Sequence, residues 1–517
     1  MSRLRVSGVA ALLVAMALWA GCGDTYRPVV IPNVPNPPSP KSSHAAFMIS
    51  NNGAINAGSG MQIDVSGDTD VGIAFMGRGP AHAAVPPGGS RVVVANTLES
   101  TITTFAPGNS NSSIGTPGTI ILPTDSLGRT ANPTFVTSEE SAAAYVANTG
   151  NDSVSALNLT SSQVSSTVFF PVGSAPIALT ETPDAKKVYV VNQGTNSVSS
   201  INVVDMSVNP AITDASIASP VWAVARGDSQ RVYVLNRSNG DIAVVNTVDD
   251  NLVSPASPVS VGAGANYMVY DNRLDRLYVT NPALGTLTIL NAGIDPPNSM
   301  VLATINLTTG ANPPCGGGCV AMSVAALPDG SQAYVTALQA NGSTTRTTVT
   351  AIDTLNNTVT KTFGLPATPP VAACTSSRFR ISTAASGDSS RLYVASCDAG
   401  NVSIVNVSSN SFLVQLPAPV SAATPSTVSI TAATQSGSNT IYTYTLTSGA
   451  VLQVGESIAI SGMQNPANNG SFVITALGNG TLTIVNSAGG SASGQGGQGG
   501  AGVASIPQTP MFIVAGP

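Results

Sequence analysis

The sequence predicts an all-β protein: a β-propeller of eight four-stranded blades, with seven as the alternative count, plus a small inserted β domain. Three observations support this prediction. Only 9% of the 517 residues are charged while Gly, Ser, Thr, Asn and Val are abundant, a composition typical of short strands joined by tight turns. A tetrapeptide recurs at a nearly regular period. A stretch near the C-terminal end lacks it but still alternates apolar and polar residues.

The tetrapeptide is aromatic or apolar at its first position and usually small and polar at its last. Its eight copies begin at Phe47, Val93, Tyr145, Tyr189, Tyr233, Tyr278, Tyr334 and Tyr393, and successive copies are 44 to 59 residues apart. In a typical unit a proline such as Pro176 opens an inner strand, and the tetrapeptide forms the second strand. A third strand ends in Asn or Asp, whose side chains close the turn to an outer strand. Four strands per unit at this period indicate a propeller blade.

The copy Tyr278-Val279-Thr280-Asn281 and its variants resemble the YVTN-repeat β-propeller family, from about residue 45 to residue 417. Members of that family commonly have seven blades, which is why seven is the alternative count. The family covers exported and surface proteins whose ligands are mostly undefined. The resemblance therefore implies an extracytoplasmic propeller and leaves its chemistry open.

The two ends of the propeller sequence are expected to share one blade. The first repeat has three strands between Ala46 and Gly77, but a proline-rich segment precedes it in place of an inner strand. Residues 509–515 have the pattern of an inner strand, a proline followed by apolar residues. Residues 505–517 are therefore predicted to supply the missing strand, which removes an exposed sheet edge.

The remaining residues before this closing strand are predicted to form a separate unit. Residues 45–424 are assigned to the propeller, and residues 425–504 to an inserted β-barrel or β-sandwich of about five short strands. Its last part, from Gly489 to Gly502, is expected to be a flexible glycine-rich run. Nothing in the sequence indicates the role of this unit.

The N-terminal residues have the order of an export signal. Arg3 and Arg5 precede an apolar run from residue 9 to residue 18, and Leu18-Trp19-Ala20-Gly21-Cys22 follows. This resembles a bacterial lipobox, which implies that residues 1–21 are a lipoprotein signal peptide and that Cys22 carries the acyl chains. Ordinary cleavage beside an incidental cysteine is the alternative.

Residues 22–44 contain six prolines and are predicted to be a semi-rigid tether. With the lipobox, they predict a protein exported and lipid-anchored in the bacterial cell envelope, facing the periplasm or the cell surface. The membrane, reached through the lipid anchor, is the first expected partner.

Four further cysteines are expected to form two disulfides, because an even number in an exported protein favours pairing. Cys374 precedes the inner strand of the last full repeat and Cys397 follows the strand paired with it. Cys315 and Cys319 flank three glycines and would staple that turn. A structural metal site is the alternative, but no histidine lies nearby and the spacing is not that of paired C-x₂-C motifs. The sequence predicts neither a metal nor a cofactor.

A ligand would meet the propeller at one opening of the central channel. The side chains expected near that opening stand two residues after the proline, or its equivalent, that opens an inner strand. They are His82, Phe135, Trp222, Tyr267 and Phe512. Packing between neighbouring blades is the favoured interpretation of these bulky groups. The alternative is a shallow aromatic site for a glycan, peptide or small aromatic compound, with Arg378 and Arg380 adding charge.

Charge and motifs limit the function. A formal net charge of −6 without basic runs argues against nucleic-acid binding. The only histidines are His44 and His82, and the sequence has no nucleophile elbow, zinc-protease motif or P-loop. A binding or scaffolding module with an envelope protein, peptide or glycan partner is therefore favoured over an enzyme. A lactonase-like hydrolytic propeller is the main alternative and would need clustered carboxylates or a metal at the channel mouth. A cofactor-dependent oxidoreductase is third.

Overall fold

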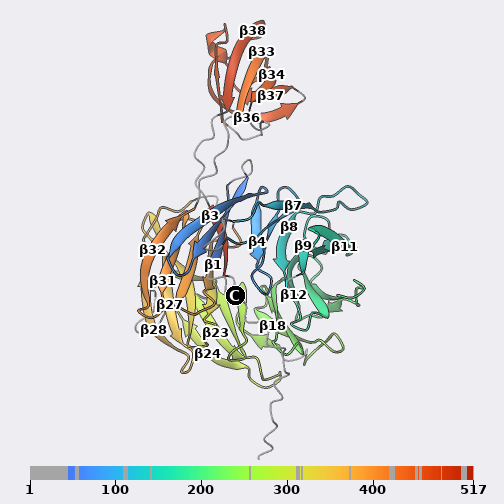
Figure 1. Cartoon of the computed structure of the whole chain (residues 1–517), viewed down its shortest axis with the longest axis vertical. Coiled ribbons are helices and arrows are strands. Elements are labelled where there is room, and N and C mark those ends of the chain that lie inside the picture. The colour runs from blue at the N-terminus through green and yellow to red at the C-terminus, as the bar shows by residue number, and fades with distance from the viewer. Residues whose placement is uncertain are drawn as a thin grey trace, which may run out of the picture. The chain divides into compact units, whose positions relative to one another are not determined.

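A computed structural model describes most of the chain after residue 44. It covers residues 45–52, 57–108, 114–139, 142–254, 258–309, 315, 318–371, 374–375, 377–418, 426–448, 452, 457–478, 480–501 and 509–515. The regular structure is almost entirely β (Figure 1). In the part of the chain so described, no helix has the length and apolar character needed to cross a membrane. The predicted signal peptide, Cys22 and the tether lie outside the described residues.

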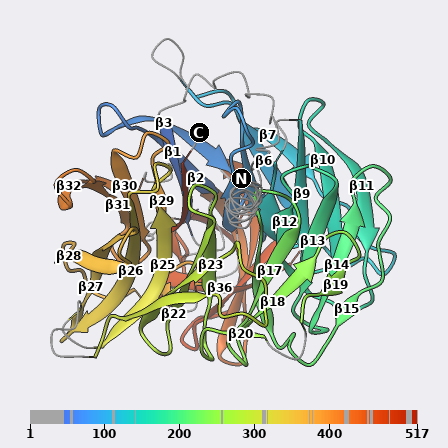
Figure 2. The ribbon, with the colours of Figure 1, turned by 90° about the horizontal axis from the view of Figure 1, so that it is seen from below.

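Eight antiparallel sheets form the blades of a propeller, which confirms the predicted fold class and the count of eight (Figure 2). We number the blades 1 to 8 in chain order. Their inner strands, from blade 1 to blade 8, are β39 (Thr509–Ala515), β4 (Pro80–Ala84), β8 (Pro133–Thr137), β12 (Pro176–Glu181), β16 (Pro220–Ala225), β21 (Tyr267–Asp271), β25 (Cys319–Ala326) and β29 (Ile381–Ala385). The prolines predicted to open inner strands do so in blades 2 to 5.

The other three strands of each blade follow in the predicted order. The second strands are β1 (Ala45–Asn51), β5 (Val92–Asn96), β9 (Ala143–Asn148), β13 (Lys187–Asn192), β17 (Arg231–Asn236), β22 (Arg276–Asn281), β26 (Gln332–Asn341) and β30 (Arg391–Ser396). The third strands are β2 (Gly58–Asp64), β6 (Thr101–Phe105), β10 (Ser153–Asn158), β14 (Ser197–Asn202), β18 (Asp241–Asn246), β23 (Thr286–Asn291), β27 (Thr344–Asp353) and β31 (Asn401–Asn406). The outer strands are β3 (Thr69–Met76), β7 (Gly118–Ile121), β11 (Gln163–Phe169), β15 (Ile212–Thr213), β19 (Asn251–Leu252) with β20 (Val259–Ser260), β24 (Val301–Asn306), β28 (Thr358–Gly364) and β32 (Ser411–Pro417).

The C-terminal strand closes the ring. β39 pairs antiparallel with β1, so that Ile513 lies opposite Met48, and it supplies the inner strand of blade 1. Neighbouring inner strands contact one another in ring order, from β39 through β4, β8, β12, β16, β21, β25 and β29 back to β39. The eight inner strands therefore surround one central axis (Figure 2).

The tyrosine that recurs in the tetrapeptide joins one blade to the next. Tyr189, Tyr233, Tyr278, Tyr334 and Tyr393 are among the largest fully buried side chains. The Tyr233 hydroxyl donates to the carbonyl oxygen of Ala292 in the following blade at 2.6 Å. The Tyr334 hydroxyl likewise lies 2.5 Å from Oδ1 of Asn410 in the following blade. The tyrosine of the repeat therefore stabilises the contact between neighbouring blades, in addition to its place in a strand of its own blade.

A cation two residues before the tyrosine adds a second bond between blades. Lys187 pairs with Asp250 at 2.8 Å and Arg231 with Asp295 at 2.6 Å. Arg391 pairs with Asp68 at 2.8 Å, which joins blade 8 to blade 1. In each case the carboxylate lies in the turn between the third and outer strands of the next blade or in the residues just after it.

Residues 426–501 form a closed six-stranded barrel. Its strands are β33 (Ser426–Ser436), β34 (Asn439–Ser448), β35 (Ser457–Ser461), β36 (Gly470–Gly478), β37 (Thr481–Val485) and β38 (Ala492–Ala501), and they pair in the order β33-β34-β37-β36-β35-β38. Ile430, Tyr442, Ile458 and Ile484 are fully buried in its core. The prediction of a small β domain at this place in the chain included a barrel as one of its two forms.

The expected flexible run from Gly489 to Gly502 is wrong. Most of it is β38, which pairs with β33 and β35 and completes the barrel. A Cβ on Gly497 would lie 2.3 Å from Sδ of Met463, and one on Gly499 would lie 2.8 Å from Cγ2 of Val428. Glycine is needed here because neighbouring side chains occupy the space beside the strand, so a composition typical of linkers instead serves close packing.

Candidate functional site

The candidate site lies on the propeller face at which the inner strands begin. In an antiparallel blade, the loop leading into the inner strand and the turn between the second and third strands lie at the same edge. We refer to this edge as the mouth face; it includes residues 237–240, 282–285 and 374–380. The opposite edge, which carries the other two turns of each blade, is the base face.

A β-bulge follows the proline in several inner strands. The register shifts directly after Pro80, Pro133, Pro176 and Pro220. A bulge leaves its extra residue outside the ladder and re-aims the side chain that follows. The residues two positions after these prolines, His82, Phe135 and Trp222 among them, are thereby directed toward the axis, where they meet.

Six rings meet at the axis and form what we name the axial cluster. Its members are His82, Phe135, Trp222, Tyr267, Phe379 and Phe512. The His82 ring lies 3.9 Å from that of Phe135 and 4.3 Å from that of Phe512, centroid to centroid. The Trp222 ring lies 4.7 Å from that of Tyr267. Because the rings come from blades 1, 2, 3, 5 and 6 and from the loop before blade 8, they pack on one another across the axis rather than between the faces of two blades.

The axial cluster is mostly inaccessible. Tyr267 is half-buried and the other five rings are buried; Trp222 is only 7% exposed. The favoured expectation is packing between neighbouring blades; the groups are buried as that expectation requires, but they pack on one another across the axis instead. Stacking of a ligand on their faces stays a prediction that the structure does not test, and a buried Trp222 weakens it.

Arg378 lies against the axial cluster. Its guanidinium carbon is 5.2 Å from the ring centroids of Trp222 and Phe379 and 5.7 Å from that of Phe135. Nη1 donates to the carbonyl of Ile177 at 2.8 Å and Nη2 to that of Val221 at 2.9 Å. Both carbonyls belong to the extra residues of bulges, so the arginine satisfies acceptors that the ladder leaves open.

Burial at the axis lowers the pKa of both His82 and Arg378. Burial, and then the positive charge of Arg378, keep the pKa of His82 well below its usual value, so the imidazole is neutral near pH 7. His82 Nδ1 accepts a hydrogen bond from the Val136 amide at 3.4 Å, which leaves the ring proton on Nε2. Burial, and then the positive charge of Arg237, lower the pKa of Arg378. No ion pair joins Arg378 to a carboxylate of a described residue.

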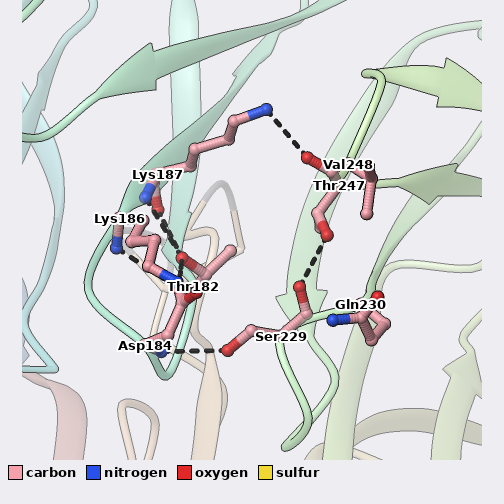
Figure 3. A pocket seen from close by; sticks show the side chains of 8 residues that line it. All are labelled: Thr182, Asp184, Lys186, Lys187, Ser229, Gln230, Thr247 and Val248. Carbon is pink, nitrogen blue, oxygen red and sulfur yellow. Dashed lines mark hydrogen bonds and ion pairs between the residues drawn. The ribbon is translucent and has the colours of Figure 1, made fainter.

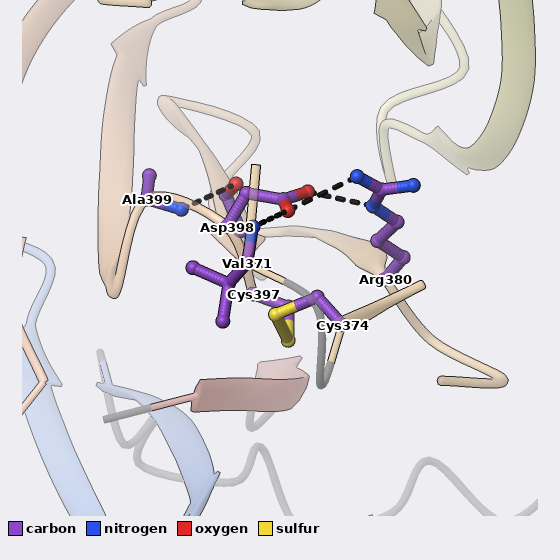
Figure 4. Close-up of a disulfide and its surroundings, with 7 residues drawn as sticks. Val371, Cys374, Arg380, Cys397, Asp398 and Ala399 are labelled. Carbon is purple, nitrogen blue, oxygen red and sulfur yellow. Dashed lines mark hydrogen bonds and ion pairs between the residues drawn. A yellow bond between two sulfur atoms is a disulfide. The ribbon is translucent and has the colours of Figure 1, made fainter. Parts of the chain in front are cut away.

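A disulfide and an ion pair hold the loop that carries Arg378 (Figure 4). The predicted bond between Cys374 and Cys397 is present, with an S–S distance of 2.03 Å. Beside it, the buried carboxylate of Asp398 accepts hydrogen bonds from Nε of Arg380 at 2.6 Å and from the Val371 amide at 2.8 Å. The loop is therefore tied at two places to the turn between β30 and β31.

The second predicted disulfide is absent from the structure. Cys315 and Cys319 are both buried and unbonded. Their sulfurs lie 3.2 Å and 3.8 Å from Oγ1 of Thr348, so the two thiols share a hydroxyl partner instead of bonding to each other. The hydrogen bond from Cys319 lowers the pKa of the Cys315 thiol. Within the described chain no three His, Cys, Asp or Glu side chains gather as they would around a metal ion.

A pocket of about 470 Å³ opens on the mouth face beside this loop. Blades 5, 6 and 7 line it, together with the loops before the inner strands of blades 6 and 8. The lining residues are Arg237, Gly264, Asn266, Pro282, Ala283, Val320, Met322, Leu338, Thr375, Ser377 and Arg380. Arg237 Nη2 donates to Oδ1 of Asn266, and Arg380 uses Nε and Nη2 on Asp398. Within the described chain no hydrogen bond engages the other guanidinium nitrogens of these two arginines.

A smaller pocket of about 190 Å³ lies on the base face between blades 4 and 5 (Figure 3). Its groups already bond to one another. The Asp184 amide donates to Oγ of Ser229 at 2.9 Å, and the Lys187 ammonium donates to the carbonyl of Thr247 at 2.8 Å. The same amide-to-serine bond recurs between blades 7 and 8, from Asp329 to Ser389. This pocket is therefore a seam between blades rather than a place for a ligand.

The structure brings together most of the residues predicted for a site and adds three that were not predicted. The five predicted rings and Arg378 form one group at the axis, and Arg380 lines the pocket beside it. Phe379, Arg237 and Asn266 were not predicted. Phe379 could have been found from its place between Arg378 and Arg380. Arg237 and Asn266 carry no sequence signal, because turns of different blades meet only in the folded ring.

Comparison with known proteins supports the fold. The family described as "Lactonase, 7-bladed beta-propeller" matches residues 73–224. The matched residues include none of those that line the mouth-face pocket, and the present propeller has eight blades rather than seven. No curated protein sequence matches the chain.

Among solved structures, dihydro-heme d1 dehydrogenase NirN in complex with DHE is 11% identical, with a TM-score of 0.53 and coverage of 73% of each chain. Hydrazine synthase of Kuenenia stuttgartiensis is 18% identical, with a TM-score of 0.45 over 63% of this chain and 95% of that one. A candidate 6-phosphogluconolactonase of Bacteroides uniformis is 13% identical, with a TM-score of 0.46 over 62% of this chain and 95% of that one. At these identities the first similarity shows the propeller fold alone, and the other two carry no argument.

Proposed function

We propose that this chain is an exported, lipid-anchored β-propeller that binds a ligand in the mouth-face pocket. The observation that carries the proposal is the pocket of about 470 Å³ with unused arginine donors at its wall. Ligand sites in proteins are concave, of about 300–1,000 Å³, and combine apolar walls with a few placed polar groups. Val320, Met322 and Leu338 supply the apolar wall here.

Binding is favoured over catalysis because the lining of the pocket, as far as it is described, holds no acid–base pair. None of its described lining residues is Asp, Glu, His or Cys. Asp398, the nearest carboxylate in the hydrogen-bond network, is occupied by Arg380 and Val371, and His82 is buried among rings. Hydrolysis of an ester or lactone needs a general base or a metal-bound water within reach of the substrate.

A pocket-filling variant tests this proposal. Ala283 is exposed and lines the pocket, so Ala283→Trp should fill it; Leu284→Trp, in the same turn but outside the lining, is the matched control. Each protein is dialysed against a small-molecule extract of the cell envelope, and retained compounds are identified by mass spectrometry. We expect a compound retained by the wild type and the control and lost from Ala283→Trp. Identical retention by all three proteins would contradict the proposed site.

A lactonase-like hydrolase is the second candidate, and the family match over residues 73–224 favours it. Its test is acid release from a panel of lactones, including 6-phosphogluconolactone, followed with a pH indicator. If the pocket only binds its ligand, we expect acid to be released at the uncatalysed rate. Turnover that disappears in Ala283→Trp would replace binding by hydrolysis as the function of the same pocket.

The proposed anchor has its own test. Replacing Cys22 with Ala removes the thiol that would be acylated, and several acyl chains are needed for stable attachment. We expect the variant to move from the membrane fraction to the soluble fraction. Retention in the membrane fraction after a high-salt wash would contradict a lipid anchor at Cys22.

A further inference from the structure

The mouth-face pocket has an excess of positive charge. Arg237 and Arg380 line it, and Arg378 lies close enough to Arg237 for their charges to interact. Of these three, only Arg380 forms an ion pair with a described carboxylate, that of Asp398. These three guanidinium groups thus have one described carboxylate among them as a counter-charge, in a protein whose formal net charge is −6. A local positive charge on a protein of negative net charge attracts anionic ligands to that part of the surface.

The arginines at the pocket have donors to offer. Each guanidinium carries five N–H groups. The Arg237 guanidinium makes one hydrogen bond to a described residue, through Nη2 to Asn266. Arg380 leaves Nη1 without a described partner. Two planar guanidinium groups with unused donors in the lining of one pocket match the oxygens of an anionic group, which arginine binds with two parallel hydrogen bonds.

Part of the lining is apolar. Val320 and Met322 come from β25 and Leu338 from β26, and Pro282 and Ala283 belong to the neighbouring turn. Val320 is 37% exposed, an unusual state for a valine on an inner strand of this ring. Burying such a side chain against an apolar ligand is favourable in proportion to the apolar area that is covered. The lining of the pocket therefore combines cationic and apolar side chains.

We infer that the pocket takes an organic anion: an acidic head group held by Arg237 and Arg380, and an apolar body lying against Val320, Met322 and Leu338. This inference rests on the proposed function and names the class of its ligand. The anion would also relieve the repulsion between Arg237 and Arg378. Carboxylates and phosphate monoesters share this chemistry, and the experiment separates them.

The test is isothermal titration calorimetry of the full chain with four probes that differ in head group. 4-Phenylbutyrate carries a carboxylate and an apolar body, 4-phenylbutyramide is its neutral counterpart, phenyl phosphate carries a phosphate, and inorganic phosphate has no apolar body. We expect the butyrate to bind at least tenfold more tightly than the amide, because the neutral amide cannot form charge-assisted hydrogen bonds with the arginines. Affinity should fall several-fold between 0.05 M and 0.5 M NaCl. Tighter binding of phenyl phosphate than of the butyrate would assign a phosphate head group within the same anion site.

Two variants locate the site. Arg237→Gln should weaken binding of the butyrate at least fivefold, whereas Arg273→Gln, which removes an exposed charge on the base face, should change it less than twofold. Equal binding of butyrate and amide, equal effects of the two variants, or no binding of any anionic probe would overturn the inference. The proposed function fails separately, when Ala283→Trp retains every envelope compound that the wild type retains.

Discussion

The two faces of the propeller use their cations in opposite ways. On the base face Lys187, Arg231 and Arg391 each pair with a carboxylate of the next blade. On the mouth face Arg378 bonds to backbone carbonyls and aromatic rings, and Arg237 bonds to an amide oxygen. The base-face cations therefore hold the ring together, whereas Arg237 and Arg378, unlike Arg380, have no described carboxylate as a counter-charge.

This difference separates stability from function within one repeat. A half-buried pair between blades, satisfied on both sides, adds to the cohesion of the ring and offers nothing to a ligand. A cation that lacks a carboxylate costs stability through desolvation and repulsion, and such costs are typical of binding sites. The mouth face also contains paired arginines, such as Arg129 with Asp152, away from the pocket. The comparison therefore concerns the pocket and axis, not the whole face.

Arg378 should give the largest effect. Arg378→Met leaves the carbonyls of Ile177 and Val221 without their donors, at about 1–3 kcal/mol for each unsatisfied buried group, partly offset by relief of the buried charge. We expect a net loss of about 2 kcal/mol in the free energy of unfolding, measured by urea denaturation. Arg378→Lys should recover little of it, since one ammonium cannot span both carbonyls. Unchanged stability in both variants would show that the axial arginine holds nothing together.

Acid should act on the axis before it acts on the base face. The pKa of His82 is lowered in the fold, so the unfolded chain takes up a proton that the native protein refuses, and stability falls as the pH drops below about 6.5. The loss approaches about 1.4 kcal/mol per pH unit. The pKa of Asp295 is lowered chiefly by its hydrogen bond with Arg231, so that pair persists to a lower pH than an unpaired aspartate would. His82→Phe should remove the difference in unfolding free energy between pH 6.5 and 5.5; the same pH slope in both proteins would exclude His82 as its source.

A base-face pair should matter for stability alone. Arg391→Met breaks the bond between blade 8 and the Asp68 turn of blade 1, and we expect a loss of about 1 kcal/mol, because both partners are less than one-fifth exposed. Lys186→Met is the control: that lysine pairs with Asp184 but is 77% exposed, so thermal unfolding should be unchanged. Loss of ligand affinity in Arg391→Met, at a temperature where it remains folded, would erase the division between the two faces.

Arg237 should give the smallest effect on stability. Its side chain is exposed and its one described hydrogen bond is to Asn266, so Arg237→Gln should change the free energy of unfolding by less than about 0.5 kcal/mol. The measurement is the urea midpoint of variant and wild type under the same conditions. A larger loss would place Arg237 in the framework of the ring rather than at a site kept for a ligand.

The sequence by itself determined the fold, because the fold is built from local patterns that repeat. Each tetrapeptide from Tyr145 to Tyr393 forms a second strand, and each proline of blades 2 to 5 begins an inner strand. The one disulfide among the described residues, Cys374–Cys397, follows from a hairpin that the repeat itself specifies. The cation two residues before the tyrosine, at Lys187, Arg231, Arg276 and Arg391, also recurs in the sequence, but only the structure shows that it bonds to the next blade.

Only the tertiary structure decided the rest. Arg378 reaches carbonyls 201 and 157 residues away, and Arg237 meets Arg380 at one pocket, because closing the ring places the loops of blades 5 to 8 side by side. The glycine-rich β38 looked like a linker because its composition shows only that side chains are missing. The reason that they are missing is the close approach of Met463 and Val428, which lie elsewhere in the barrel. Cys315 and Cys319 looked like a staple because spacing says nothing of Thr348 lying beside both sulfurs. Period and pattern are carried by neighbours along the chain, but charge balance and close contact are properties of neighbours in space.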